Sequence, residues 1–269
     1  MFFVSALPFV GCSATPQRAN PEPTDRSWLA AHVQADPWLA AASPLNPQHL
    51  PSIATLVALP FLAEEDDRIS RRLTRDRPVG GSSGSRHGDV VAAVLAGSPL
   101  VAAGAAAVFP PESDSALELV EVGVESVGWT VLATELLKPL VGRERPNNNS
   151  GRGGRANPSN RSFPSGHVAS AMAGAVVSGR WLRAQSLWFV PAELALYGGV
   201  IYTAFTRVEN DKHFPTDVAA SIIIGGYLAN TVWDAHYGRD GDGIFEIWKF
   251  VPAPTAAGDG ILLMWCVNF

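Results

Sequence analysis

The chain has few cysteines and few charged residues. Its 269 residues include two cysteines, Cys12 and Cys266, and no pair spaced as in cysteine-rich zinc sites, so such a site is not expected. Two cysteines alone do not establish a disulfide. Charged residues make up 17% of the chain, below the roughly 25% of typical soluble proteins. The net charge of -5 gives no support for nucleic-acid binding.

Apolar and small residues are abundant instead. Hydrophobic residues make up 47% of the chain, and glycine occurs 25 times. Small residues let helices approach one another closely, both in lipid and in a protein core. The composition therefore predicts closely packed helices.

The first 19 residues resemble an export signal. Residues 1–12 are apolar and end in small residues before Cys12, as at the end of a bacterial lipoprotein signal whose cysteine becomes lipidated. No Lys or Arg precedes this stretch, which a start site upstream of Met1 would explain. A secretory signal or a membrane-entering segment is the alternative. We expect a location in the cell envelope, periplasmic or membrane-associated, with Cys12 as anchor in the lipoprotein case.

The rest of the chain predicts one helical domain with flanking segments. Residues 20–50 are expected to be a linker and irregular structure, 51–234 a helical domain, and 235–269 a C-terminal extension. Residues 51–62 form a short helix candidate, the charged run 64–77 a solvated surface helix, and 80–88 a flexible loop. Residues 90–109 are as long as a membrane span and equally compatible with a buried core helix.

One further helix, over 117–141, carries an acidic face. Glu118, Glu121 and Glu125 share it, so it must meet water or polar protein groups rather than lipid. Helices are also expected over 165–182, 187–205 and 216–233, and two strands over 244–251 and 261–269.

The first of three polar clusters runs from Lys138 to Pro146, at the expected end of a helix. Lys138 and Arg145 flank that end, and a loop rich in arginine and asparagine continues to residue 163. Two fixed cations can hold a phosphate dianion, and arginine adds a planar fork of donors. Taken alone, these residues are more typical of a basic helix end that complements the helix dipole.

The second cluster, residues 163–167, opens a helix after that loop. Ser165 can serve as N-cap, and Gly166 leaves backbone N–H groups open to an anion. His167, in the first turn, can then donate a proton to a leaving oxygen. A capped helix with an incidental histidine would look the same.

The third cluster runs from Thr206 to Asp217. His213 precedes a helix opened by Pro215, and Asp217 follows four residues after His213. Asp217 can bond one ring nitrogen of His213 and leave the other as a nucleophile, while Arg207 supplies a third cation. By itself, the cluster also fits a surface histidine and an aspartate that complements a helix dipole.

Together the clusters resemble the signature of the type 2 phosphatidic acid phosphatase (PAP2) and vanadium haloperoxidase superfamily, in its bacterial phosphatase branch. That signature reads K-x6-RP, PSGH and SR-x5-H-x3-D, and each spacing and the order fit. Thr206 is the one departure, since the family has Ser there. The resemblance covers about residues 90–234. It implies an all-α bundle of about six core helices with the site at one end, to which the strand pattern adds a short C-terminal β-hairpin.

The resemblance also implies a mechanism that needs no metal or other cofactor. His213 would attack phosphorus and form a phosphohistidine, Asp217 would orient His213, and His167 would protonate the leaving group and then activate water. Vanadate would inhibit by imitating five-coordinate phosphorus. The phosphate would be bound by Lys138, Arg145, Ser165, Gly166 and Arg207.

The expected substrate is a lipid phosphate such as phosphatidate, or a polyprenyl diphosphate, at a membrane. A small soluble phosphoester is the alternative. Two other functions stay open. A haloperoxidase would use vanadate as cofactor, but such relatives are usually much longer. A non-catalytic envelope protein would be expected to lose a catalytic histidine, whereas His167 and His213 are both present.

Overall fold

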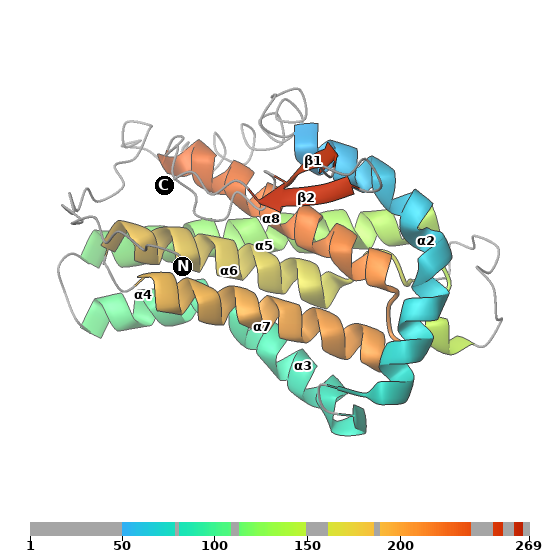
Figure 1. Cartoon of the computed structure of the whole chain (residues 1–269). Helices are drawn as coiled ribbons and strands as arrows, with labels where there is room; N and C mark the ends of the chain where they lie inside the picture. The colour runs from blue at the N-terminus through green and yellow to red at the C-terminus, as the bar shows by residue number, and fades with distance from the viewer. Residues whose placement is uncertain are drawn as a thin grey trace, which may run out of the picture.

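The computed structural model is an all-α bundle, as predicted (Figure 1). The predictions for residues 1–49, including Cys12, and for most of the loop before residue 161 lie outside the part of the chain that the structure describes. The described residues are 50–78, 81–108, 113–148, 161–185, 189–237, 250–254 and 261–265.

Seven α-helices lie within the described ranges. They are α2 (Leu50–Asp76), α3 (Gly81–Ala96), α4 (Ser98–Val108), α5 (Ser113–Val141), α6 (Gly166–Gln185), α7 (Phe189–Glu209) and α8 (Pro215–Tyr237). A 3-10 turn, η3 (Pro146–Asn148), follows α5.

Helix α6 forms the centre of the bundle. It packs against α3, α5, α7 and α8, and every side chain from position 171 to 179 is buried. A helix surrounded on all sides has no solvent face, so its sequence is apolar or small all round. This explains why α6 is rich in alanine and valine rather than amphipathic.

Two glycines allow this close packing. A Cβ atom on Gly174 of α6 would lie 2.0 Å from the carbonyl oxygen of Leu95 in α3. A Cβ atom on Gly225 of α8 would lie 2.2 Å from the carbonyl oxygen of Ala169 in α6. Since both neighbours are backbone atoms, any larger residue would push the helices apart.

The prediction of a flexible loop over residues 80–88 is wrong, because α3 begins at Gly81 and runs through this stretch. Gly88 faces α7, where an added Cβ would lie 2.0 Å from Oγ1 of Thr206. The glycine therefore serves contact between helices and not a turn of the chain.

The apolar stretch 90–109 is divided at Gly97 rather than continuous. Pro99 would clash with the carbonyl group of Leu95 in an unbroken helix, and the hydroxyl of Ser98 donates to that carbonyl oxygen at 2.7 Å. Among the described residues no single helix has the length and apolarity of a membrane span. The pair Gly84–Ala96 and Ser98–Gly104, bent by 53°, meets both criteria together.

The predicted acidic face of α5 meets polar protein groups. Oε2 of Glu125 lies 2.7 Å from Nε2 of His236, a buried residue of α8. A carboxylate partnered in this way needs no contact with water.

Helix α2 is continuous where two segments were predicted, and it crosses one end of the bundle (Figure 1). It packs against α7 and α8. The prediction of a wholly solvated surface helix over 64–77 is wrong at Asp66, which is 1% exposed, and at Ser70, which is 3% exposed.

The predicted C-terminal hairpin is present. Strands β1 (Phe250–Pro254) and β2 (Ile261–Trp265) pair antiparallel, with Phe250 opposite Trp265. β1 continues to Pro254, beyond the predicted end at residue 251, and the predicted residues 244–249 and 266–269 lie outside the described part of the chain.

Candidate active site

The three polar clusters meet at one end of the bundle, beside α2. Helix α5 ends there, α6 begins there, and α7 turns into α8 there (Figure 1). The antiparallel packing of these helices thus gathers residues that are far apart in the sequence. All eight predicted site residues lie at these helix ends.

Lys138 lies in the last turn of α5. Gly142 ends that helix with a φ of 60°, and its N–H bonds the carbonyl oxygen of Lys138 at 2.8 Å, as in a glycine C-cap. A Cβ atom on Gly166 would lie 3.5 Å from Nζ of Lys138, so this amine reaches the start of α6. Glu135 pairs with Lys138 and, at 2.9 Å, with Arg161. Lys138 therefore has a carboxylate partner.

Ser165 immediately precedes α6. Its carbonyl oxygen accepts the N–H of Ala169 at 3.0 Å, and its own N–H donates to Oγ of Ser221 at 2.7 Å. Its hydroxyl is buried and has no hydrogen-bond partner within the described residues, so the predicted side-chain N-cap bond is absent.

Two arginine donors share this property. Nε of Arg145 and Nε of Arg207 are buried and have no hydrogen-bond partner in the described ranges. A buried donor without an acceptor costs about 1–3 kcal/mol. Several of them at one end of the bundle indicate a site for an anion, whose oxygens would accept from each. In the same ranges, no three His, Cys, Asp or Glu side chains are arranged as metal ligands.

A tight turn joins α7 to α8 and brings His213 beside Arg207. The N–H groups of Lys212 and His213 donate to the carbonyl oxygen of Arg207 at 3.0 and 3.3 Å. Asp211 takes up the left-handed conformation, with a φ of 53°, in this turn. The chain then enters α8 at Pro215, whose fixed φ suits a helix start.

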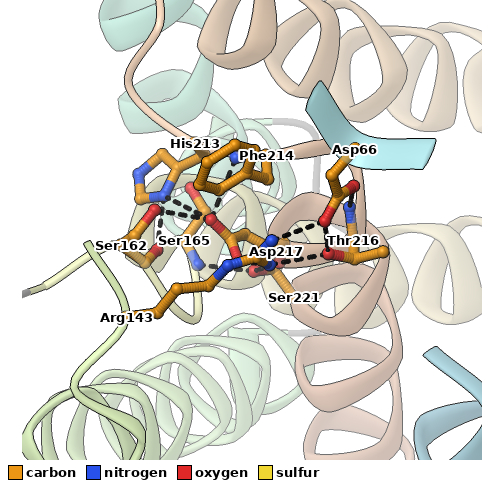
Figure 2. A network of polar contacts seen from close by, with 9 residues as sticks. All are labelled: Asp66, Arg143, Ser162, Ser165, His213, Phe214, Thr216, Asp217 and Ser221. Carbon is orange, nitrogen blue, oxygen red and sulfur yellow. Dashed lines mark hydrogen bonds and ion pairs between the residues drawn. The ribbon is translucent and has the colours of Figure 1, made fainter. Parts of the chain in front are cut away.

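His213 is buried, with 4% of its surface exposed. Its Nδ1 lies 2.5 Å from the carbonyl oxygen of Ser162, which can only accept a hydrogen bond. Nδ1 therefore carries the proton and Nε2 a free lone pair, and Figure 2 shows the outer ring nitrogen pointing away from the polar network. Burial lowers the pKa of His213 to about 3, and the charges of Arg145 and Arg207 add to this. The ring is neutral at physiological pH.

Asp217 does not bond His213 directly, contrary to the prediction. Its nearer oxygen lies 3.9 Å from Nδ1, beyond hydrogen-bond length. That oxygen, Oδ2, accepts from Oγ of Ser162 at 2.6 Å and from the N–H of Phe214 at 2.9 Å (Figure 2). Asp217 thus fixes Ser162, whose carbonyl oxygen in turn fixes the ring of His213. Burial raises the pKa of Asp217, while Arg143, Ser162 and the amide of Phe214 act in the opposite direction.

His167 lies in the first turn of α6 and is half exposed. Burial lowers its pKa, followed by the charges of Lys138 and Arg145. Asp89 of α3 was not predicted from the sequence. Its Oδ1 lies 3.2 Å from Nε2 of His167 and also pairs with Arg207. This carboxylate joins the expected proton donor to an expected phosphate ligand.

Three further residues of the site were missed by sequence reasoning. Ser162 and Arg143 stood among the polar residues of the predicted loop, and Asp66 stood in the charged run of α2. The only signal for Arg143 was its position inside the first cluster, two residues before Arg145. No local pattern marked Asp66, because its role depends on contacts with distant segments.

One family model matches the part of the chain that contains the three polar clusters. Residues 123–240 match the family model described as the PAP2 superfamily, and the match supports a phosphatase of the PAP2 type. No curated protein sequence matches the chain significantly. One solved structure similar to this chain is the crystal structure of the first transmembrane PAP2 type phosphatidylglycerolphosphate phosphatase from Bacillus subtilis. The two are 20% identical with a TM-score of 0.46 over 76% of this chain and 93% of that chain.

Proposed function

We propose that this chain, whose residues 123–240 match the PAP2 superfamily model, is a metal-independent phosphatase acting through a phosphohistidine on His213. One observation carries the proposal. A buried, neutral histidine with its Nδ1 proton fixed on a carbonyl oxygen stands among arginines whose Nε donors lack partners in the described residues. This pairs a nucleophile with a site for phosphate oxygens.

The first step transfers the phosphoryl group to the protein. The Nε2 lone pair of His213 forms a bond to phosphorus while the bond from phosphorus to the ester oxygen breaks. His167 gives its proton to that oxygen, so the alcohol leaves neutral. The imidazole ring, still protonated at Nδ1, becomes positively charged. Asp217, 3.9 Å from Nδ1, is the buried negative charge that offsets it.

The second step releases inorganic phosphate. A water oxygen bonds to phosphorus, and His167, now neutral, accepts the water proton. The bond between phosphorus and Nε2 of His213 breaks, and its electron pair returns to the ring. His167 is then protonated again, and both histidines have regained their starting states.

Fixed cations stabilise the transferring group in this scheme. Lys138, Arg145 and Arg207 neutralise the charge on the phosphoryl oxygens, as a metal ion does in other phosphatases. The Ser165 hydroxyl, which is buried without a partner in the described residues, and the Gly166 amide at the start of α6 add hydrogen bonds.

An exposed apolar stripe on α5 favours a lipid phosphate over a soluble ester. Leu132, Leu136 and Leu140 recur every four residues along α5 and are 47%, 58% and 79% exposed. This apolar stripe runs toward the end of α5 that carries Lys138, and helical side chains at this spacing share one face. Lys138 lies two positions from Leu136 and from Leu140, which is about 160° round the helix, so the stripe faces outward while Lys138 faces the site. An exposed leucine face of this kind suits contact with a membrane, where a lipid substrate would lie. The proposed substrates are phosphatidate or a polyprenyl diphosphate, at the membrane of the cell envelope.

The test measures phosphate release from a generic aryl phosphate and from phosphatidate in detergent micelles, with excess chelator. We expect the wild type to be active with chelator present, and His213→Ala to lose activity by at least about a thousandfold. His236→Gln is the matched control, because His236 is likewise a buried histidine and lies near the far end of α8, about 30 Å along the helix from Pro215. Activity lost on chelation, or kept by His213→Ala, would disprove the mechanism.

A further inference from the structure

Arg143 lies between two buried carboxylates. Its Nη1 donates to Oδ1 of Asp217 and to Oγ1 of Thr216, both at 2.7 Å, and its Nη2 donates to Oδ2 of Asp66 at 2.6 Å (Figure 2). Its guanidinium carbon lies 4.2 Å from the centre of the Phe214 ring. Only arginine has a planar fork of donors that can bond two carboxylates at once.

Asp66 reaches this site from α2, outside the segment that matches the PAP2 model. Its Oδ1 accepts the backbone N–H of Thr216 at 2.9 Å, and its Oδ2 accepts the Thr216 hydroxyl as well as Arg143. Asp66 thereby caps the first turn of α8 from a distant part of the chain. A carboxylate with 1% exposure is costly unless it is paired, and Arg143 provides the pairing charge.

The same contacts extend to the proposed nucleophile. Arg143 holds one oxygen of Asp217, while Ser162 and the amide of Phe214 hold the other. The carbonyl oxygen of Ser162 in turn accepts from Nδ1 of His213. A rotation of the Asp217 carboxylate would break bonds on both sides, so Arg143 limits the movement of the residues that fix the His213 ring.

We infer that Arg143, held in place by Asp66, is a positioning residue for His213 that acts through Asp217 and Ser162. The inference rests on the phosphohistidine chemistry proposed above. Arg143 keeps the Asp217 carboxylate aligned so that its charge is available when the His213 ring becomes positive. It also keeps Ser162 where its carbonyl oxygen holds the Nδ1 proton. Helix α2 is therefore part of the catalytic apparatus and does more than cover the end of the bundle.

A purely structural role makes a different prediction. If the pair of Asp66 and Arg143 only fastened α2 to α8, its loss would lower the melting temperature and leave the folded protein with normal turnover. If Arg143 positions His213, its loss lowers kcat with little change in KM, because substrate is bound by other residues. It also lets the His213 proton move between Nδ1 and Nε2.

The experiment compares wild type with Arg143→Lys, Arg143→Gln and Asp66→Asn. The control is Glu193→Gln, which neutralises another buried carboxylate paired with an arginine, Arg183, about 25 Å along α6 from Gly166. The assays are kcat and KM on an aryl phosphate with chelator, the melting temperature, and ¹⁵N NMR of the His213 ring at neutral pH.

We expect Arg143→Gln to lower kcat about a hundredfold, the effect of misplacing a catalytic group by about 1 Å, with KM changed less than about threefold. Arg143→Lys, which keeps the charge, should recover part of this loss. The two ring nitrogens of His213 should give distinct protonated and unprotonated signals in wild type and converge in Arg143→Gln and Asp66→Asn. Glu193→Gln should lower the melting temperature and change neither kcat nor the His213 signals.

Normal kcat and unchanged His213 signals in the Arg143 and Asp66 variants would overturn the inference. The NMR arm needs no turnover. If wild type released no phosphate, the proposed function would fail, and the His213 signals would still decide whether Arg143 positions the ring. If Arg143→Gln did not fold, Arg143→Lys would supply the comparison, since it retains the buried charge.

Discussion

Nδ1 of His213 lies 2.5 Å from the carbonyl oxygen of Ser162, so the main chain fixes the tautomer of the ring. A carbonyl oxygen accepts hydrogen bonds and does not titrate, unlike a carboxylate. The unprotonated state of Nε2 is therefore maintained over a wide pH range. Asp217 contributes one step further away, by holding Ser162.

Acid should destabilise the protein through His213. Its pKa is about 3 when folded, against about 6.5 in the unfolded chain. Between these values the unfolded state binds more protons, so stability falls as the pH drops from about 6.5 toward 3. The loss due to this residue should approach about 1.4 kcal/mol per pH unit. Urea unfolding at pH 7, 6 and 5 should give a shallower pH dependence for His213→Asn than for wild type. Equal slopes would mean that His213 keeps an ordinary pKa.

His167 should set the alkaline limit of activity. Burial and the neighbouring cations Lys138 and Arg145 lower its pKa below the usual 6.5. A general acid must be protonated in the free enzyme, so kcat/KM should fall as the pH rises through that pKa. The acid limit, set by protonation of His213, lies near 3. A profile of kcat/KM from pH 3 to 8 on one aryl phosphate should therefore have its maximum in the acid range.

His167→Asn provides the control for that profile. This variant should lower the rate by a factor of about 10²–10⁴, and its kcat/KM should no longer fall at alkaline pH. With a nitrophenyl ester, whose leaving group needs little protonation, the variant should release a burst of nitrophenol and accumulate phosphohistidine, because water is no longer activated. If kcat/KM of His167→Asn still fell at alkaline pH, a group other than His167 would be responsible for the alkaline limit.

The sequence was sufficient to locate the eight predicted site residues at one end of the bundle, because each motif lies at a helix terminus. Spacings such as that between His213 and Asp217 are set by local geometry. The contacts beyond the motifs depend on tertiary packing. Asp66 bonds Thr216 across 150 positions and stands in a charged run that reads as solvated surface. Nothing in that run distinguishes Asp66 from the other carboxylates.

Glycine was misread for a related reason. Local reasoning takes a glycine-rich stretch as a turn. In α3, Gly88 instead provides room for Thr206 of α7, a contact visible only once the helices are packed. The direct bond predicted between Asp217 and His213 failed similarly, since spacing brought the two together but Ser162, from another segment, lies closer.

Ser162 and Asp217 should act as one unit. Ser162→Ala removes the hydroxyl that bonds Oδ2 of Asp217 at 2.6 Å and keeps the carbonyl group. We expect it to lower kcat about ten- to a hundredfold, matching the roughly 1.5–3 kcal/mol of a hydrogen bond to a charged group. Asp217→Asn should cost more, and the double variant should be little worse than Asp217→Asn alone. If the factor by which kcat falls in the double variant equalled the product of the two single factors, the two residues would act independently.

Packing around α6 gives a prediction about stability. Gly174→Ala would place a Cβ atom 2.0 Å from a backbone oxygen of α3, which no rotamer change relieves, and should destabilise by about 3 kcal/mol. Gly128→Ala is the matched control, since no atom lies within 4 Å of its Cβ position in α5. That variant should be up to about 1 kcal/mol more stable, because alanine favours helix. Urea unfolding of both would measure the difference, and equal effects would mean that α3 and α6 are not in close contact.

Asp89 should compete with the phosphate group of the substrate. Its Oδ1 pairs with Arg207 and lies 3.2 Å from Nε2 of His167, so a bound anion must displace this carboxylate or tolerate its charge. Asp89→Asn should therefore bind vanadate about tenfold more tightly, equivalent to about 1.4 kcal/mol, and Arg207→Gln should bind it more weakly. Inhibition by vanadate at fixed pH and ionic strength gives both values, with Glu193→Gln as a charge-matched control far from the site. Weaker vanadate binding by Asp89→Asn would mean that Asp89 holds Arg207 in its binding position, because the loss of that support would then outweigh the loss of a competing charge.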